Sequence, residues 1–311
     1  MQHVQNLGEL QLDRSSLTIG SFDGVHLGHH DLLHRMAERA KQAALPVVVL
    51  SFFPHPSVVL RQRSPAFYIT TPEEKAELLG QEGVDYVITQ PFDLELSKVE
   101  AGDFLDRLTA RLGFVDLWAG EDFALGYQRR GNRHFLEKEG RARNFHFHLV
   151  PPLLVGGEVV SSTRVREALR SGDVARAATY LGRSFNLLGL VQKGVGRGKE
   201  LGIPTANLKI WEERATPAVG VYACIVEFDG ERKQAVTNIG YRPTFEDKPE
   251  EPIIEAHILD FERELYGQEI RVEFIDRLRD EMRFSGPEEL LKQIELDIGQ
   301  ARILLESRTL D

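Results

Sequence analysis

The chain has 311 residues, of which 42% are hydrophobic and 28% charged, values typical of a soluble globular protein and unlike a disordered one. At about 100–200 residues per domain, this length predicts two domains. Lys and Arg total 38 against 48 Asp and Glu, which gives a net charge of −10. This charge argues against nucleic acid or a membrane as a partner, although a local cationic site for a small anion stays possible.

Cysteine content excludes two further classes of protein. The single cysteine, Cys224, allows neither an intrachain disulfide nor a multi-cysteine zinc site, and it favours a reducing, cytoplasmic location. Its place in the apolar run 221–226 indicates a buried structural thiol.

The N-terminus has no signal pattern, and the longest apolar stretch, 45–53, is far shorter than the ~20 residues that span a bilayer.

The first half of the chain alternates strands with helices. Apolar runs predict strands, and a 3.6-residue stripe or a capping box predicts helices. Thr71 to Glu74 and Ser97 to Glu100 both read as capping boxes. In chain order we expect a strand at 17–22, a helix at 31–44, a strand at 47–53, a helix from 71, a strand at 84–89, a helix from 97 to about 113, and strands at 114–119 and 145–150. This alternation predicts an α/β fold with a doubly wound parallel sheet.

The second half follows a different pattern, with apolar runs separated by turn signals. Strands are expected at 186–192, 219–228, 233–239, 253–261 and 269–275, with a tight turn at Asp229-Gly230. An apolar stripe over 287–305 predicts a C-terminal helix. We therefore expect a small antiparallel β-barrel with a C-terminal helix, and a domain boundary near residue 182.

The strongest chemical signal is the segment 20–29, at the junction between the first expected strand and a helix. The carboxyl end of a strand in an open α/β sheet is a ligand-binding position, and a helix N-terminus attracts phosphate. His26 and His29 are three residues apart, so both imidazoles project from one face and can stabilise phosphate charge in a transition state. Gly28 between them lets a ligand approach the backbone closely. Two exposed histidines in a glycine-rich turn are the plainer alternative.

This segment resembles the His-x-Gly-His signature of the nucleotidylyltransferases, and its longer form is similar to the bacterial bifunctional riboflavin kinase/FMN adenylyltransferase family. Two further segments, 160–166 and 120–126, resemble motifs of the same family, although Ala124 and Leu125 depart from the second motif. The resemblance implies catalysis by His26, His29 and Arg166, whose planar fork can clamp phosphate oxygens. It also implies binding of nucleotide or flavin by Gly20, Phe22, Asp23, Gly24, Gly28, Asp122, Gly126, Ser162 and Thr163. Ser162 is also expected to cap the helix that follows it.

The second half carries a matching set of kinase motifs. A glycine-rich segment with Gly194 and Gly198 is not a Walker A loop, but the Pro-Thr-Ala-Asn run that follows resembles riboflavin kinases. Pro204, Thr205 and Asn207 are then expected to bind nucleotide, with Thr205 and Asn207 as oxygen ligands of Mg²⁺. The resemblance extends through 238–245 and assigns Glu255 as the carboxylate at the attacking hydroxyl, facing a barrel mouth, and Arg279 and Phe284 to flavin binding. His257 is expected to be structural.

The resemblance covers nearly the whole chain and implies two reactions. Residues 1–182 would adenylylate FMN with ATP to give FAD and pyrophosphate, and residues 183–311 would phosphorylate riboflavin with Mg–ATP to give FMN. The expected small molecules are ATP, riboflavin, FMN and FAD. Two alternatives remain at this stage: a nucleotidylyltransferase for a different phosphate, with the barrel as an accessory module, and a flavin- or nucleotide-binding regulator without catalytic activity.

Overall fold

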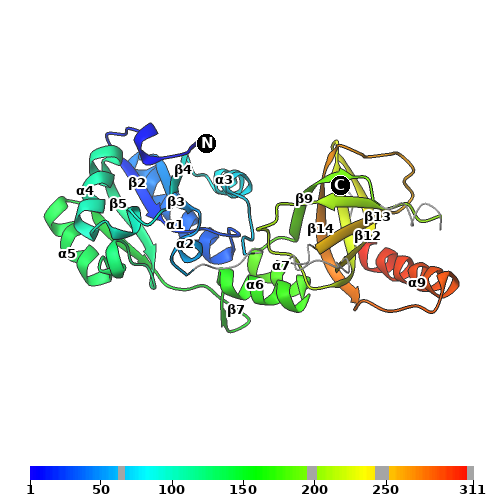
Figure 1. Cartoon of the computed structure of the whole chain (residues 1–311). Helices are drawn as coiled ribbons and strands as arrows, with labels where there is room; N and C mark the ends of the chain where they lie inside the picture. Colours follow the sequence, from blue (N-terminus) through cyan, green and yellow to red (C-terminus); the bar gives the residue numbers. More distant parts are fainter. Residues whose placement is uncertain (62–66, 195–201, 242–251, 307–311) are drawn as a thin grey trace. The chain divides into compact units, whose positions relative to one another are not determined.

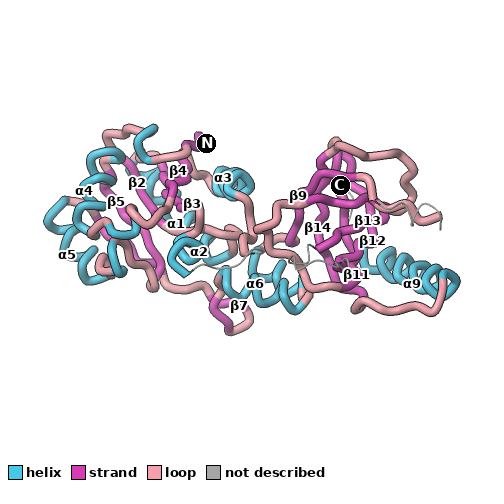
Figure 2. The backbone as a smooth tube through the Cα atoms, viewed as in Figure 1, coloured by secondary structure: helices cyan, strands magenta, loops and turns pink. Residues whose placement is uncertain are grey.

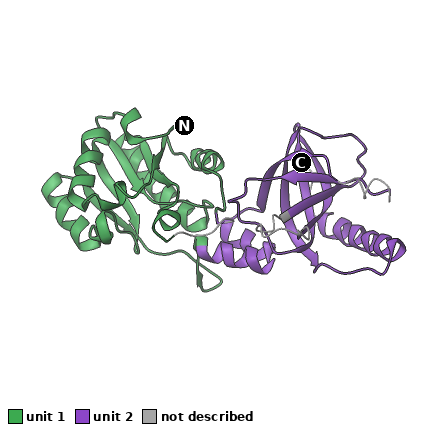
Figure 3. Ribbon diagram, viewed as in Figure 1, with its two compact units in different colours: residues 1–64, 68–162 green, residues 65–67, 163–311 purple. Residues whose placement is uncertain are grey.

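The computed structural model describes residues 1–61, 67–194, 202–241 and 252–306. The chain divides into two compact units, one formed by residues 1–64 and 68–162 and the other by 65–67 and 163–311 (Figure 3). Helices α6 (Ser162–Ser171) and α7 (Val174–Leu181) therefore belong almost entirely with the second unit, although they precede the domain boundary expected near residue 182.

The first unit contains a six-stranded parallel sheet with strand order β1-β4-β3-β2-β5-β6 (Figure 1). The predicted α/β fold is confirmed. Its strands are β1 (Gln2–Val4), β2 (Ser15–Ile19), β3 (Val47–Phe53), β4 (Tyr86–Pro91), β5 (Phe114–Gly120) and β6 (His146–Val150). Its helices are α1 (Leu27–Ala43), α2 (Pro56–Arg61), α3 (Pro72–Gln81), α4 (Ala101–Leu112) and α5 (Arg133–Arg143), with short 3₁₀ turns at Leu7–Glu9, Leu96–Lys98 and Tyr127–Arg129.

Helices cover both faces of this sheet, so each strand is buried on two sides. On one face, Leu105 and Leu108 of α4 and Leu136 of α5 pack against the strands. On the other face, Leu33 of α1 and Leu79 of α3 do so. This two-sided burial explains why the strands read as continuous apolar runs rather than as alternating patterns.

Three helix starts test the sequence reading of this unit. The capping box at Thr71 is confirmed, because its hydroxyl and the Glu74 carboxylate bond reciprocally to the backbone at the start of α3. The box at Ser97 was wrong: this serine lies in a 3₁₀ turn, and α4 begins only at Ala101. Helix α1 begins at Leu27, four residues before the expected start, because its cap is an unusual one.

The second unit contains a closed antiparallel barrel of strand order β10-β13-β12-β11-β14-β9 (Figure 2). The strands are β9 (Phe185–Gln192), β10 (Ala206–Lys209), β11 (Gly220–Phe228), β12 (Glu231–Tyr241), β13 (Pro252–Ile258) and β14 (Glu269–Arg279), followed by α9 (Pro287–Leu305). Asp229 and Gly230 both adopt positive φ between β11 and β12, as a tight hairpin turn requires. Strand β10 was not predicted. A small hairpin, β7 (Leu154–Val155) with β8 (Glu158–Val159), precedes α6.

The barrel and α9 share a core that includes Val221, Ala223 and Ile225 on β11 and Ala301 and Leu305 on α9. The predicted C-terminal helix is therefore confirmed in extent and in its packing. Cys224 is fully buried on the opposite face of β11, and burial raises the pKa of its thiol to about 12. This cysteine is a structural thiol, as its sequence context indicated. Among the described residues, no helix is long and apolar enough to cross a membrane.

Candidate functional site

The loop that follows β2 has an irregular backbone that other segments hold in place. Phe22, Gly24 and Val25 all have positive φ, and for a bulky or β-branched side chain this conformation is strained. Asp23 is buried, and its carboxylate accepts hydrogen bonds from the backbone N–H groups of Ile69 and Thr70, at 3.0 to 3.2 Å. The Thr70 hydroxyl in turn accepts from the Gly24 N–H at 3.1 Å. Strain held by surrounding contacts is a frequent feature of functional sites.

The two imidazoles of this segment cap helix α1 reciprocally. The His29 N–H donates to Nδ1 of His26 at 3.4 Å, and the His26 N–H donates to Nδ1 of His29 at 3.2 Å. The rings stack with centroids 3.6 Å apart and planes 14° apart. Because each Nδ1 accepts a hydrogen bond, the neutral form of each ring carries its proton on Nε2. In that form, Nε2 is the hydrogen-bond donor of each ring.

The neighbouring residues of the segment support this pair of rings. A Cβ on Gly28 would lie 3.2 Å from the His26 ring, so this glycine makes room for the imidazole. Phe22 is buried and its ring centroid lies 4.8 Å from that of His29. Gly20 follows β2, and its N–H donates to the carbonyl of Leu50 on β3 at 3.0 Å. The loop thus leaves the sheet at the carboxyl ends of two adjacent parallel strands, which is the usual ligand position in such a sheet.

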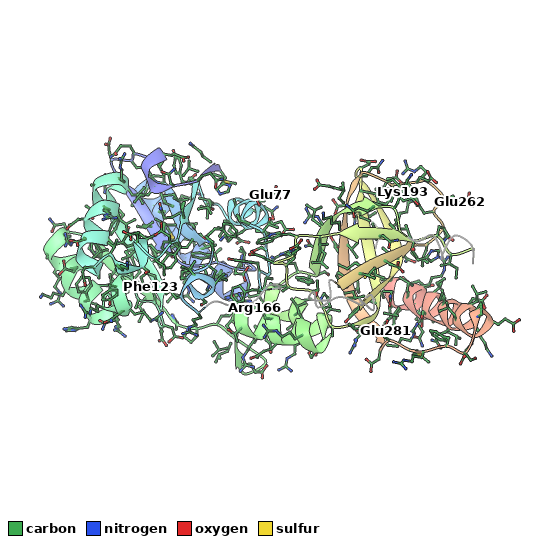
Figure 4. All side chains as sticks on the ribbon, in the orientation of Figure 1. Glu77, Phe123, Arg166, Lys193, Glu262 and Glu281 are labelled. Atoms are coloured by element: carbon green, nitrogen blue, oxygen red, sulfur yellow. The ribbon has the colours of Figure 1, made fainter. Side chains whose placement is uncertain are left out.

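The segment 160–166 divides between the two units. Ser162 is the first residue of α6 rather than the residue before it, and its hydroxyl donates to the Asp23 carbonyl at 2.8 Å. This contact joins the serine to the loop that precedes His26. Thr163 is exposed. Arg166 is buried in the second unit, where its Nε donates to the Phe67 carbonyl at 2.8 Å and its guanidinium lies 3.9 Å from the Phe67 ring centroid (Figure 4).

The loop after β5 lies in the first unit. Asp122 is exposed, and its carbonyl accepts a hydrogen bond from Arg129. Gly126 has positive φ and directly precedes the 3₁₀ turn Tyr127–Arg129, while Leu125 is buried in the core with α4 and α5. Leu125, which departs from the family motif, therefore occupies a position in the packed core. Phe123 is partly buried against the same core.

One residue near the loop after β2, Lys75, was not identified from the sequence. Lys75 of α3 is buried, and its ammonium donates to the Ser51 hydroxyl at 2.6 Å and to the Ser21 carbonyl at 3.3 Å. Burial lowers the pKa of Lys75 to about 8, against the opposing attraction of Asp23. A signal was present in the sequence, because Lys75 and Leu79 lie on the same helix face.

The barrel brings several predicted kinase residues into one row. Asn207 on β10 lies directly opposite Glu255 on β13, and Glu255 lies opposite Asn238 on β12. Directly paired residues of antiparallel strands point to the same face. Ile254 and Ala256, the neighbours of Glu255, are fully buried in the barrel, so this row lies on the face that points away from the barrel interior.

Asn207 has the features of a ligand-binding amide. Its Oδ1 is buried and accepts no hydrogen bond from any described residue. A buried polar atom without a partner is unusual in a folded protein, and an amide oxygen is a hard ligand of the kind that Mg²⁺ prefers. A Cβ on Gly194 would lie only 2.4 Å from Nδ2 of Asn207, so this glycine is required for the position of the amide. The residues present therefore fit a Mg²⁺ ion. Gly198 and residues 242–245 lie outside the described part of the chain.

His257 connects the row to the segment before β10. Its Nδ1 lies 2.8 Å from the carbonyl of Pro204, which can only accept, so the imidazole donates. Thr205 directly follows this proline and directly precedes β10. His257 therefore holds the Pro-Thr-Ala-Asn segment against β13, a structural contact of the kind expected for it.

Arg279, expected near the flavin, is engaged by a buried acid. Its Nε and Nη2 donate to the Asp297 carboxylate of α9 at 2.8 to 3.0 Å, and its guanidinium lies 5.8 Å from the ring centroid of the partly buried Phe284. Asp297 is buried. Arg279 thus has a structural role, since it connects the end of β14 to α9.

Metal ligation by a cluster of histidines and carboxylates is not found over the described ranges, where no group of three or more His, Cys, Asp or Glu is placed to hold an ion. His146 and His148 share a strand face, but His148 stacks on Trp118 at 4.2 Å and its Nε2 lies 2.6 Å from the Asp116 carboxylate. His148 is therefore held in place by Trp118 and Asp116.

Comparison with known proteins decides the family. A family model described as FAD synthetase matches residues 9–164, and one described as riboflavin kinase matches residues 181–305. Bifunctional riboflavin kinase/FMN adenylyltransferases are 35% identical over 303 residues in Bacillus subtilis (strain 168) and 36% identical over 301 residues in Escherichia coli (strain K12). Both alignments cover 96% of this chain and 95% of the relative. The chain belongs to the bifunctional riboflavin kinase/FMN adenylyltransferase family.

The two family models divide the site residues between them. The FAD synthetase match includes His26, His29 and Ser162 and ends two residues before Arg166. The riboflavin kinase match includes Asn207, Glu255 and Arg279. A solved structure from Streptococcus pneumoniae, titled a macrolide-efflux protein, has the same fold: its TM-score is 0.88 at 29% identity, over 97% of this chain and 98% of that one. Macrolide efflux describes that protein and is not inferred for this chain.

Proposed function

We propose that this chain makes both flavin cofactors: it phosphorylates riboflavin with ATP to give FMN, and it adenylylates FMN with a second ATP to give FAD and pyrophosphate. The kinase and adenylyltransferase activities are those of the family to which the chain belongs. The observation that carries the residue assignments is the reciprocal cap of α1, which fixes two Nε2 donors at a helix N-terminus. We assign adenylyl transfer to residues 1–182 and phosphorylation to residues 183–311.

In adenylyl transfer, a phosphate oxygen of FMN attacks the α-phosphate of ATP and pyrophosphate leaves. His26 and His29 donate through Nε2 to phosphate oxygens as their negative charge grows. The cap occupies the N–H groups of His26 and His29. Within the described part of the chain, the N–H groups of Leu27 and Gly28 are those left at the helix start for a phosphate oxygen. Arg166 is assigned a further phosphate contact through its guanidinium.

The remaining predicted residues of this reaction are assigned to binding. Gly20, Phe22, Asp23 and Gly24 shape the loop that enters α1, and Asp23 acts through its hydrogen bonds to residues 69 and 70. Ser162 reinforces the same loop through the Asp23 carbonyl. Asp122, Gly126 and Thr163 are assigned to the nucleotide or flavin on the strength of the family motifs.

In riboflavin phosphorylation, the terminal ribityl hydroxyl of riboflavin attacks the γ-phosphate of ATP. Glu255 orients this hydroxyl and accepts its proton, since a carboxylate near the nucleophile is the usual requirement of a kinase. Thr205 and Asn207 would hold Mg²⁺, which when bound neutralises charge on the ATP phosphates. The placement of Asn207 directly opposite Glu255 supports this, because one register pair brings the metal ligand and the base to the same face. Gly194, Gly198 and Pro204 are assigned to the nucleotide, and Arg279 and Phe284 to the flavin.

Net charge and cysteine content support the remaining assignments. A chain with a net charge of −10 and one buried cysteine suits a cytoplasmic enzyme whose partners are small molecules rather than nucleic acid or membrane. Phosphates are attracted locally, by helix N–H groups, imidazoles, Arg166 and Mg²⁺.

Product analysis tests the proposal. The full chain is incubated with riboflavin, ATP and Mg²⁺, and the flavins are separated by chromatography. We expect FMN to appear first and FAD to follow, and FMN supplied directly to give FAD. Folded protein that forms no FMN would remove the kinase assignment, and failure to convert supplied FMN would remove the adenylyltransferase assignment.

A further inference from the structure

A buried lysine lies beside the loop that carries the imidazoles, and neither proposed reaction uses it. Lys75 is 6% exposed, and its ammonium donates to the Ser51 hydroxyl near the carboxyl end of β3 and to the Ser21 carbonyl just after β2. The Ser51 hydroxyl also donates to the Ser21 carbonyl, at 3.1 Å. The Ser21 carbonyl of the loop thus accepts two hydrogen bonds, one from Lys75 and one from Ser51.

The same stretch of chain holds the loop a second time. The N–H groups of Ile69 and Thr70 donate to the Asp23 carboxylate, and the Thr70 hydroxyl accepts from the Gly24 N–H. Thr70 lies only five residues before Lys75. The loop is therefore fixed at Ser21 by the side chain of α3 and at Asp23 and Gly24 by the segment that enters α3. Between and after these anchors the backbone has positive φ at Phe22 and Val25, so the anchors hold a conformation that the loop alone would not favour.

Burial of an ammonium is costly, and a hydrophobic side chain of similar volume is often as good or better for stability. The charges that face Lys75 are Asp23 on the loop and Glu73 on α3. The pKa of His3 on β1 is lowered mainly by burial and further by the Lys75 charge. The pKa of Lys75, lowered to about 8 by burial, is low enough for the charge to be lost in a mildly alkaline range. A charge buried at this cost beside a strained loop is better explained by the reaction than by folding.

We propose that Lys75 is a positioning residue for adenylyl transfer, which holds the Ser21 carbonyl together with Ser51 and so fixes the loop that presents His26 and His29. The inference rests on the proposed function of that loop. Its contribution belongs to the transition state, because a small displacement of the phosphate-binding donors costs rate more than it costs substrate binding.

The main test compares Lys75→Met, which keeps the length of the side chain without its charge, with the exposed matched control Glu77→Gln on the same helix (Figure 4). For Lys75→Met we expect the kcat of FMN-to-FAD conversion to fall on the order of a hundredfold with little change in the KM for ATP. The thermal midpoint should be unchanged or raised, and riboflavin phosphorylation by the same chain should be unaffected. The control should retain both activities.

A double-mutant cycle tests the route through Ser21. Ser51→Ala alone should reduce the same kcat by about two- to tenfold, the value of one hydrogen bond. Combined with Lys75→Met it should add little, because both side chains act on the same carbonyl. Full additivity would contradict the shared route and overturn the proposal as stated.

The pH profile of the wild-type chain gives a readout that a purely structural lysine would not produce. FMN-to-FAD conversion should decline as the pH rises through about 8, phosphorylation should not, and Lys75→Met should lack this alkaline decline. A folded Lys75→Met within twofold of wild type overturns the inference while leaving the proposed function intact. If Lys75→Met does not fold, the inference is tested by the kcat of Ser51→Ala and by the pH profile of the wild type. A wild-type kcat in Ser51→Ala together with no alkaline decline would overturn it. A wild-type chain that makes no FAD from FMN overturns the proposed function, and this inference with it.

Discussion

The two units place their candidate chemistry by different means. In the first unit the residues belong to a loop and a helix start, and a strained backbone is fixed by side chains from elsewhere, such as Asp23 and Lys75. In the barrel, Asn207, Glu255 and Asn238 are brought together by the register of three neighbouring strands. Substitutions that touch no substrate should therefore affect the first site more than the second.

Removal of the proposed base is the largest expected effect, and it tests the separation of the two sites. For Glu255→Gln we expect riboflavin phosphorylation to fall by about 10²- to 10⁴-fold, the range for loss of a general base. Conversion of supplied FMN to FAD should be unchanged. Both rates are measured on one preparation, by chromatography of the flavins. Equal loss of both activities in folded protein would contradict two independent sites.

His29→Ala is the corresponding change in the first unit. We expect FMN-to-FAD conversion to fall by about 10²- to 10³-fold, as for the loss of one preorganised donor to a developing charge. The substitution also removes half of the reciprocal cap, so His29→Gln, which can accept at the same position, serves as a control for helix stability. Riboflavin phosphorylation should persist in both variants. Adenylyl transfer at the wild-type rate in His29→Ala would exclude the donor role.

Arg279 tests whether a residue assigned to the flavin is first a structural one. Arg279→Met leaves the Asp297 carboxylate buried without its bidentate partner, and breaking such a pair costs about 3 kcal/mol. We expect the free energy of unfolding of the barrel to fall by that amount, as measured by denaturant titration. The double variant Arg279→Met with Asp297→Leu should recover most of the stability. If it does so without recovering the KM for riboflavin, the arginine also contacts the flavin.

Much of the fold could be predicted because its signals are local. Helix α9 was predicted from its apolar stripe, and β3 from a run buried on both sides. Strand β10 was missed because it has four residues and ends in an exposed lysine, so it shows no apolar run. The box at Ser97 was wrong because the chain forms a 3₁₀ turn there before α4 begins.

The candidate sites divide in the same way. His26 and His29 were found by motif and spacing, although histidine is not a usual cap and the start of α1 was therefore placed too late. Lys75 was missed because its partners, Ser21 and Ser51, are distant in sequence and are ordinary serines. The pairing of Arg279 with Asp297 was also missed, because the two residues lie 18 positions apart in different elements. Motifs show which residues belong to a site, whereas tertiary contacts show which residues hold it.

Gly194→Ala tests how far register alone fixes the barrel site. A Cβ at this position would meet the Asn207 amide, which must then move although β10 stays paired with β13. We expect about a tenfold rise in the KM for Mg–ATP in phosphorylation, with FMN-to-FAD conversion unchanged as the internal control. Asn207→Ala should show a larger effect of the same kind. An unchanged KM in Gly194→Ala would mean that the position of the amide is not critical.

The smallest expected effect separates stability from activity in the first unit. Because burial lowers the pKa of Lys75 from 10.5 to about 8, the unfolded chain binds one more proton than the folded chain between these values. The free energy of unfolding contributed by this group therefore rises with pH in that window, by at most about 1.4 kcal/mol per pH unit. Measured as the difference between Lys75→Met and wild type, the stability advantage of methionine should shrink from pH 8 to pH 10. Adenylyl transfer should fall over the same range, so its loss cannot be attributed to unfolding. A parallel fall in stability and activity would instead make Lys75 a folding residue.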